Sequence, residues 1–284
     1  MIELPESHVL VEQINKTLVG KTIRNVVANA HPHSFAFYTG DPNTYRKKLS
    51  GKKITSSLKP GTGYTCGNVE ILCEDMLLVI STPIKYHATG EKLPKSHQLL
   101  IEFDDFSYMS CTVQMWGGMF CYPIKKNGST KDKVCDRCSV CHKGKCPDPL
   151  TDAFDQIYFD SLWSNAKPAL SVKAFLATEQ RIPGLGNGVL QDILFNAQIH
   201  PKRKLQTMND KEKKKIFRSI KSTLKAMKDK GGRNTEKNLF NCNGGYEVIL
   251  SNNTLKNPCR VCDSKLIREA YLGGNIYYCP ICQK

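Results

Sequence analysis

"QRIPGLGNGVLQDILFNAQIHP" fills residues 180–201 and decides how the carboxyl-terminal half of the chain folds. Gly184, Gly186 and Gly188 stand close together in it, and a segment with apolar residues at helical spacing follows them. These glycines predict a tight turn whose backbone N–H groups can approach an anion, with the positive end of the next helix adding to the attraction. Asn187 is a good helix cap and a neutral donor to a phosphate. By itself the pattern also fits a plain turn between two helices, so the surrounding sequence has to distinguish the two.

Helical patterns lie on both sides of this turn. Apolar residues recur at helical spacing over residues 149–163, 171–180, 187–199 and 209–231. Several of these segments have Ser, Asn or Asp near their starts, and the last one runs into two consecutive glycines, which are typical helix boundaries. We therefore predict a helical carboxyl-terminal domain.

The chain carries a strong excess of positive charge. It has 41 Lys and Arg against 26 Asp and Glu, and residues 202–237 alone hold fourteen Lys and Arg against four Asp and Glu. The excess indicates a polyanionic partner, with nucleic acid the first candidate and an anionic membrane surface the second. A merely solvated helix face is the alternative for residues 202–237, although such faces usually mix both signs. Without a long apolar run, and with Glu3 and Glu6 at the amino end, we expect a cytoplasmic protein.

The first 122 residues show a different pattern. Residues 5–18 predict a helix, because apolar residues recur every three or four positions and Pro5 suits the first turn. From residue 22 to about residue 122 the chain consists of short β-rich runs such as "KTIRNVVA", "VEILCEDMLLVI" and "QLLIEF", broken by Gly, Asp and Pro. This spacing favours an antiparallel β-sandwich or barrel.

Four cysteines near the carboxyl end have the spacing of a zinc site, C-x2-C-x16-C-x2-C. Each C-x-x-C pair can place two thiolates on one metal ion, and the alternating stretch between the pairs predicts a hairpin that brings them together. Tetrahedral zinc bound by four cysteines fits this arrangement. The predicted ligands are Cys259, Cys262, Cys279 and Cys282.

A second group of cysteines lies in a polar stretch that reads as an interdomain linker. Its spacing is C-x2-C-x2-C-x4-C, which differs from a bacterial ferredoxin run by one extra residue before the last cysteine. A loop this compact could hold a second zinc ion or an iron–sulfur cluster. The residues concerned are Cys135, Cys138, Cys141 and Cys146.

Three stretches together resemble the formamidopyrimidine-DNA glycosylase and endonuclease VIII family: "ELPE" at the amino end, "RIPGLGNGVLQDILFNAQIHP", and the terminal finger ending "YYCPICQ". The resemblance implies an α+β fold of two domains and a zinc ion. Its parts would be an antiparallel β-sandwich with a leading helix over residues 1–128, a cysteine-rich linker over 129–150, a helix-two-turn-helix domain over 151–238 and a β-hairpin zinc finger over 239–284.

The resemblance also gives a meaning to the amino terminus. In the family the initiator methionine is removed, and the α-amine of a proline attacks the sugar C1′ to form a Schiff base while the adjacent glutamate handles protons. Glu3 matches that glutamate, but Ile2 stands in place of the proline. Met1 would be expected to stay before a residue as large as Ile2, so the attacking amine would belong to Met1, or to Ile2 if Met1 is removed.

Further residues match positions that contact DNA in the family. Asn68 replaces a catalytic-loop lysine, and Gly274 replaces an arginine of the finger, so two positive charges are missing. Asp192 takes the place of a glutamate that supports the catalytic pocket. Trp116 would be a wedge between bases, or alternatively an ordinary strand residue of the sandwich. The predicted DNA-binding residues are Lys173, Asn187, Gly186, Trp116, Gln114 and Asn68.

These observations lead to one main hypothesis and two alternatives. The main hypothesis is a monomeric base-excision DNA glycosylase and AP lyase, with duplex DNA that contains a damaged base or an abasic site as its partner. The first alternative is a DNA-damage-binding homologue that lacks the chemistry. The second is a redox-sensing or metal-sensing DNA protein that uses the linker cysteines.

Overall fold

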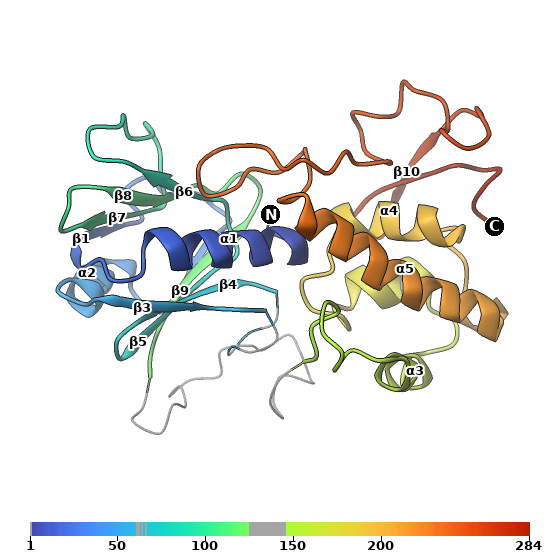
Figure 1. The fold of residues 1–284 in the computed structure, drawn as a ribbon, viewed down its shortest axis with the longest axis horizontal. Coiled ribbons are helices and arrows are strands. Elements are labelled where there is room, and N and C mark those ends of the chain that lie inside the picture. Colours follow the sequence, from blue (N-terminus) through green and yellow to red (C-terminus); the bar gives the residue numbers. More distant parts are fainter. Residues whose placement is uncertain (1, 61–62, 64, 66, 125–145) are drawn as a thin grey trace. The chain divides into compact units, whose positions relative to one another are not determined.

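The computed structural model describes residues 2–60, 63, 65, 67–124 and 146–284. These divide into two compact units, each described by itself (Figure 1). The first unit contains residue 2, the chain from residue 6 up to the linker, and residues 236–244. The second unit contains residues 3–5, 146–235 and 245–284. The segment Glu3–Pro5 therefore belongs to the second unit, although the rest of the helix that begins within it belongs to the first.

Two β-sheets form the first unit. One has four antiparallel strands and the other has five. In spatial order the four-stranded sheet consists of β1 (Ile23–Ala28), β7 (Leu99–Phe103), β8 (Tyr108–Cys111) and β6 (Ile84–His87). The five-stranded sheet consists of β2 (Ala36–Tyr38), β9 (Gly117–Pro123), β5 (Met76–Ile80), β4 (Val69–Cys73) and β3 (Ile54–Leu58).

A single hydrophobic core joins these sheets to the leading helix α1 (Leu4–Thr17). Strand β5 shows the alternation that a sheet requires, since Leu78 and Ile80 enter this core while Leu77 and Val79 pack on the opposite face. Helix α1 adds Leu10, Ile14 and their neighbours to the same core. Figure 1 shows α1 running beside the strands of this unit. The predicted leading helix and β-sandwich are confirmed.

One pairing differs from the antiparallel sandwich that the sequence predicts. Strand β2 pairs in parallel with β9, with Ala36 opposite Gly117. The connection between these two strands is long and includes the short helices η1 (Pro42–Thr44) and α2 (Tyr45–Leu49). A hairpin would force antiparallel pairing, whereas a long crossover connection leaves the direction free.

The second unit is built from helices and a β-hairpin. Helix α5 begins with a complete capping box: the side chain of Asn209 accepts from the backbone N–H of Glu212, and the carboxylate of Glu212 accepts from the backbone N–H of Asn209. Its elements are α3 (Gln156–Ser164), η3 (Ala174–Thr178), α4 (Asn187–Ala197), η4 (Leu205–Thr207), α5 (Asp210–Asp229), β10 (Ile267–Tyr271) and β11 (Gly274–Tyr278).

Two of the predicted helices are shorter than the apolar pattern indicated. Over residues 149–163 the helix starts only at Gln156, because Asp155 caps it by accepting from the backbone N–H of Tyr158 at 2.7 Å. Over residues 171–180 the helical turn is a π-helix, with the backbone N–H of Glu179 bonded to the carbonyl of Ala174 at 3.0 Å. Within the described ranges, none of the helices has the length and apolar character needed to cross a membrane.

Candidate active site and metal centre

Helix α4 has no side chain of its own at its amino-terminal cap, because the cap residue is Gly186. The carboxylate of Glu3 takes that place. Its Oε1 accepts from the backbone N–H of Gly188 at 2.9 Å, and its Oε2 accepts from the backbone N–H of Val189 at 2.7 Å. These are the N–H groups that a capping side chain normally satisfies, and the helix dipole favours a negative charge there. Glu3 is therefore fixed on the glycine-rich turn.

A guanidinium completes the surroundings of this carboxylate. Nη1 of Arg233 lies 3.2 Å from Oε2 of Glu3, and the side chains of Arg233 and Glu3 are only 3% and 8% exposed. The turn has to be free of side chains to admit them. A Cβ at Gly186 would overlap the carboxylate of Glu3, and a Cβ at Gly188 would overlap the guanidinium of Arg233. The two glycines thus leave space for the carboxylate of Glu3 and the guanidinium of Arg233. This restricts the residue type at both positions more than a tight turn alone would.

Asp192, one turn further along α4, is fully buried. Its carboxylate accepts from the backbone N–H groups of Ile249 and Leu250 at 2.9 and 3.0 Å. Burial raises the pKa of Asp192, and hydrogen bonds from Ile249, Leu250 and the side chain of Tyr246 oppose that shift. Asp192 has no exposed surface for a substrate, so it holds the segment around residue 249 against α4.

Lys173, Asn187 and Gly274 lie close together where the β-hairpin meets the start of α4. The ammonium group of Lys173 donates to the backbone carbonyl of Tyr271, and the amide of Asn187 donates to the carbonyl of Asn275 at 2.9 Å. A Cβ at Gly274 would lie 3.6 Å from both Nζ of Lys173 and Nδ2 of Asn187. Burial lowers the pKa of Lys173. We call Lys173, Asn187 and Gly274 the cation cluster. Lys173 provides the one charged side chain among these three residues.

The remaining predicted DNA contacts belong to the first unit. Asn68 precedes β4, and its backbone carbonyl accepts from the hydroxyl of Ser7 at 3.0 Å. Gln114 and Trp116 lie in the exposed loop between β8 and β9, so Trp116 is not a strand residue. Met115 between them is 80% exposed and was not singled out from the sequence.

The amino end is described from Ile2 onward. The side chain of Ile2 is buried in the core of the first unit, while Met1 lies outside the described residues. Of the linker cysteines, Cys146 is buried, and the predicted metal ligands Cys135, Cys138 and Cys141 lie outside the described residues.

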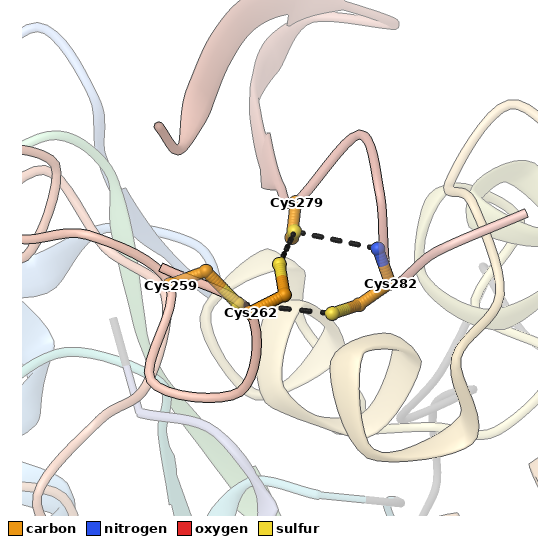
Figure 2. Close-up of side chains that lie close together, drawn as sticks. All are labelled: Cys259, Cys262, Cys279 and Cys282. Carbon is orange, nitrogen blue, oxygen red and sulfur yellow. Dashed lines mark hydrogen bonds between the residues drawn. The ribbon is translucent and has the colours of Figure 1, made fainter. Parts of the chain in front are cut away.

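The four carboxyl-terminal cysteines converge as their spacing predicts (Figure 2). Their sulfur atoms all lie within 4.8 Å of one another, with Sγ of Cys259 and Cys282 separated by 3.8 Å and Sγ of Cys262 and Cys279 by 3.5 Å. A tetrahedral zinc ion with Zn–S distances of about 2.3 Å would place its sulfur ligands about 3.8 Å apart. The cluster therefore fits a zinc ion, and the hairpin of β10 and β11 joins its two halves.

Arg233 is the functional candidate that the sequence did not reveal. It follows two glycines at the end of α5, in "GGRNTEKN", and nothing in that stretch indicates an acidic partner 230 positions earlier. Gly231 and Gly232 both have positive φ, at 72° and 100°, which reverses the chain after the helix. The signal that could have pointed to Arg233 was indirect: a buried carboxylate at residue 3 would require a cation.

Comparison with known proteins places these features in a class. Residues 146–237 match the family model described as the formamidopyrimidine-DNA glycosylase H2TH domain. The second unit is thus the helix-two-turn-helix type of domain, with a four-cysteine finger attached to it.

Full-length relatives extend the match beyond this domain. The formamidopyrimidine-DNA glycosylase of Listeria monocytogenes is 25% identical over 293 residues, which cover 100% of both chains. That of Prochlorococcus marinus is 29% identical over 142 residues, about half of each chain (49%). The Lactococcus lactis Fpg structure, a complex with DNA that contains an abasic site, has a TM-score of 0.78 at 21% identity over 99% of both chains. The Thermus thermophilus MutM (Fpg) structure has a TM-score of 0.77 at 19% identity, covering 99% of this chain and 98% of that one. The chain thus carries the helix-two-turn-helix domain of the formamidopyrimidine-DNA glycosylases, and proteins of that name are similar to it over its full length.

Proposed function

We propose that the protein is a DNA glycosylase with AP lyase activity that acts on damaged bases or abasic sites in DNA. The observation that carries the proposal is the carboxylate of Glu3, which three donors hold at the amino terminus of α4, next to the residue that would provide the attacking amine. The family places its proton-transferring glutamate at this position. Relatives over the full length are named as formamidopyrimidine-DNA glycosylases, which supports the same activity.

The chemistry follows from an amine and an acid beside one sugar. A neutral α-amine attacks C1′ of the damaged nucleotide, the bond between C1′ and the base breaks, and its electron pair leaves with the base, which takes up a proton. An α-amine has a pKa of about 7.7 to 8, so a useful fraction is neutral near pH 7. The C1′–O4′ bond then breaks and O4′ takes up a proton, so the sugar ring opens and an imine forms between the amine and C1′. Removal of a proton from C2′ then allows loss of the 3′ phosphate by β-elimination. Glu3 would transfer protons to and from the sugar during these steps.

DNA contacts would come from both units. In the second unit, Lys173, Asn187 and the turn at Gly186 would bind a phosphate, because an ammonium group and polar N–H donors recognise phosphate oxygens. In the first unit, Asn68 would bind the strand, and Trp116 and Gln114 would probe the base stack as an aromatic wedge and its polar neighbour. A duplex that contains a lesion or an abasic site, bound by one copy of the chain in the cytoplasm, is the partner in this proposal.

A zinc ion would serve the fold of the finger. Cys259, Cys262, Cys279 and Cys282 would hold it, and when bound it stabilises a hairpin module with little core of its own. We expect one zinc ion per chain by elemental analysis. A second ion, or an absorbance band from an iron–sulfur cluster, would have to be assigned to the linker cysteines.

Borohydride trapping on abasic-site DNA tests the activity. Reduction of an imine between the protein and the sugar gives a covalent adduct, and intact mass and peptide mapping locate it at Met1 or Ile2. Omission of borohydride is the matched control, and a duplex without the abasic site controls for chance crosslinking. An adduct at the amino terminus together with strand cleavage supports the proposal. Tight, salt-sensitive DNA binding with neither adduct nor cleavage of any lesion would show a DNA-damage-binding protein instead.

A further inference from the structure

We propose that Arg233 is a positioning residue for the carboxylate of Glu3, and that it leaves Oε1 of Glu3 as the oxygen that exchanges the proton. This inference rests on the proposed function, because it assigns a part in that reaction to a residue that the resemblance did not single out. Arg233 would act only through Glu3 and would contact neither the base nor the phosphates.

The hydrogen bonds of Glu3 distinguish its two carboxylate oxygens. Oε2 accepts from the backbone N–H of Val189 and faces Nη1 of Arg233 at 3.2 Å, whereas Oε1 accepts from the backbone N–H of Gly188 and from no other group of the described residues. A carboxylate offers about four lone-pair sites, two on each oxygen. Among the described residues, these contacts fill the sites on Oε2 and leave one on Oε1. The guanidinium thus fixes which oxygen can accept or return a proton.

The backbone around Arg233 holds the guanidinium in place. Arg233 forms a parallel bridge with Tyr246, the N–H of Asn234 donates to the carbonyl of Tyr246 at 2.8 Å, and the N–H of Tyr246 donates to the carbonyl of Gly232 at 3.0 Å. Gly188 leaves the space that the guanidinium occupies. Because the backbone is hydrogen-bonded on both sides of Arg233, the Cα–Cβ direction of this residue is fixed. The guanidinium is therefore held toward Glu3.

Two further titratable groups in the described part of the chain are linked to Arg233, and both are buried. Asp192 is electrostatically attracted to Arg233, and the hydroxyl of Tyr246 is bonded to Asp192. Arg233 therefore lies among two carboxylates and one phenol. Loss of the guanidinium would leave two buried negative charges without their shared cation, which is costly in a low-dielectric environment.

The acidic partner of Arg233 argues against the simplest alternative role for an arginine in a DNA-binding protein. Nη1 of Arg233 faces Oε2 of Glu3 at 3.2 Å, so this donor is directed to a carboxylate and not to a backbone phosphate. A lysine would carry the charge but not the planar fork that aligns with a carboxylate. The effect of Arg233 should consequently appear in the rate of the chemical step, with DNA affinity unchanged.

A double-mutant cycle between Arg233 and Glu3 tests the inference. Arg233→Met keeps the length of the side chain and removes its charge, Arg233→Lys keeps the charge, and Glu3→Gln removes the acid. We measure the single-turnover rate of strand cleavage with enzyme in excess over abasic-site DNA, its pH profile, the affinity for the same DNA, and thermal stability. Arg24→Met removes an exposed arginine from the first unit as a matched control.

We expect Arg233→Met to lower the single-turnover rate by about 10- to 100-fold, the effect of misplacing a reacting group. Its pH profile should shift, its affinity for DNA should stay that of the wild type, and Arg233→Lys should restore part of the rate. In the Glu3→Gln background, Arg233→Met should have little further effect, because both changes remove one interaction.

Equal losses in both backgrounds, or a loss of rate that only follows a loss of binding or of folded protein, would overturn the inference. An inactive wild-type protein would instead refute the proposed function, whereas an active wild type with an unaffected Arg233→Met variant refutes the role of Arg233 alone.

Discussion

Two clusters lie at the glycine-rich turn at the start of α4, and they differ in how completely their charges are matched. The carboxylate of Glu3 is surrounded by donors, two from the backbone and one from Arg233. The cation cluster of Lys173, Asn187 and Gly274 has one ammonium group, and at Gly274 there is no side chain at all. The turn thus fixes the carboxylate of Glu3 with three donors, whereas it would offer a phosphate only one charged partner. The lysine-rich segment from residue 202 to 237 would then supply much of the affinity for DNA through long-range attraction.

Glu3→Gln should have the largest effect, because it removes the group around which the first cluster is built. We expect the single-turnover rate on abasic-site DNA to fall by about 10²- to 10⁴-fold, the usual contribution of a positioned acid or base. Affinity for the DNA should persist, since Glu3 does not bind a phosphate. Glu12→Gln, at an exposed position of the helix α1 that follows Glu3, is the control. A Glu3→Gln variant that cleaves as fast as the control would remove the distinction between the two clusters.

Lys173→Met should come next, because it takes away the only charged side chain of the cation cluster. A charge-assisted hydrogen bond to a phosphate contributes about 1.5 to 3 kcal/mol, so the dissociation constant should rise by about 10- to 100-fold. The salt dependence of binding should also become less steep by about one phosphate contact. Fluorescence anisotropy at several salt concentrations measures both quantities. Lys173→Arg serves as the control that keeps the charge, and an unchanged slope in Lys173→Met would mean that Lys173 touches no phosphate.

Gly274→Arg tests the same cluster in the opposite direction. A side chain is admissible there, because a Cβ would make only ordinary contacts of 3.6 Å with Lys173 and Asn187, and Gly274 is not among the glycines with positive φ. The added guanidinium should raise DNA affinity by up to about tenfold at low salt and steepen the salt dependence by about one contact. Gly274→Gln controls for bulk. Weaker binding by Gly274→Arg would indicate that this side of the turn does not face the DNA.

The sequence could predict those parts of the molecule whose causes are local. The spacing of Cys259, Cys262, Cys279 and Cys282 was enough to predict their convergence, because a C-x-x-C pair acts within one short turn. The helical pattern after Gly186 likewise predicted α4 within two residues of its end. The cap of α4 was not predictable from the pattern, since Glu3 lies 185 positions before Gly188 in the chain.

Contacts between residues that lie far apart in the sequence could not be predicted from it. Arg233 was missed because only the folded chain brings it to Glu3, and the proximity of Gly274 to Lys173 and Asn187 likewise depends on how the finger packs on α4. Family resemblance named Glu3, Lys173 and Asn187 one by one. The resemblance did not predict which of these residues contact one another. Those contacts define the two clusters and the difference between them.

The smallest expected effect concerns pH, because a shift in pKa changes only the fraction of Lys173 that is charged. Burial lowers the pKa of Lys173 from the ordinary value of 10.5. A phosphate binds the protonated amine, so DNA binding takes up a proton and affinity should decline as pH rises toward the lowered pKa. Folding has the opposite sign. The unfolded chain keeps the ordinary, higher pKa and so binds more protons over this range, and the stability of the free protein should rise with pH. From pH 7 upward, Lys173 should therefore lower the affinity of the wild type for DNA and raise its thermal stability. In Lys173→Met, both pH dependences should lack the part that comes from Lys173. A wild-type affinity whose pH dependence equals that of Lys173→Met would show that the ammonium group of Lys173 takes no part in holding the DNA.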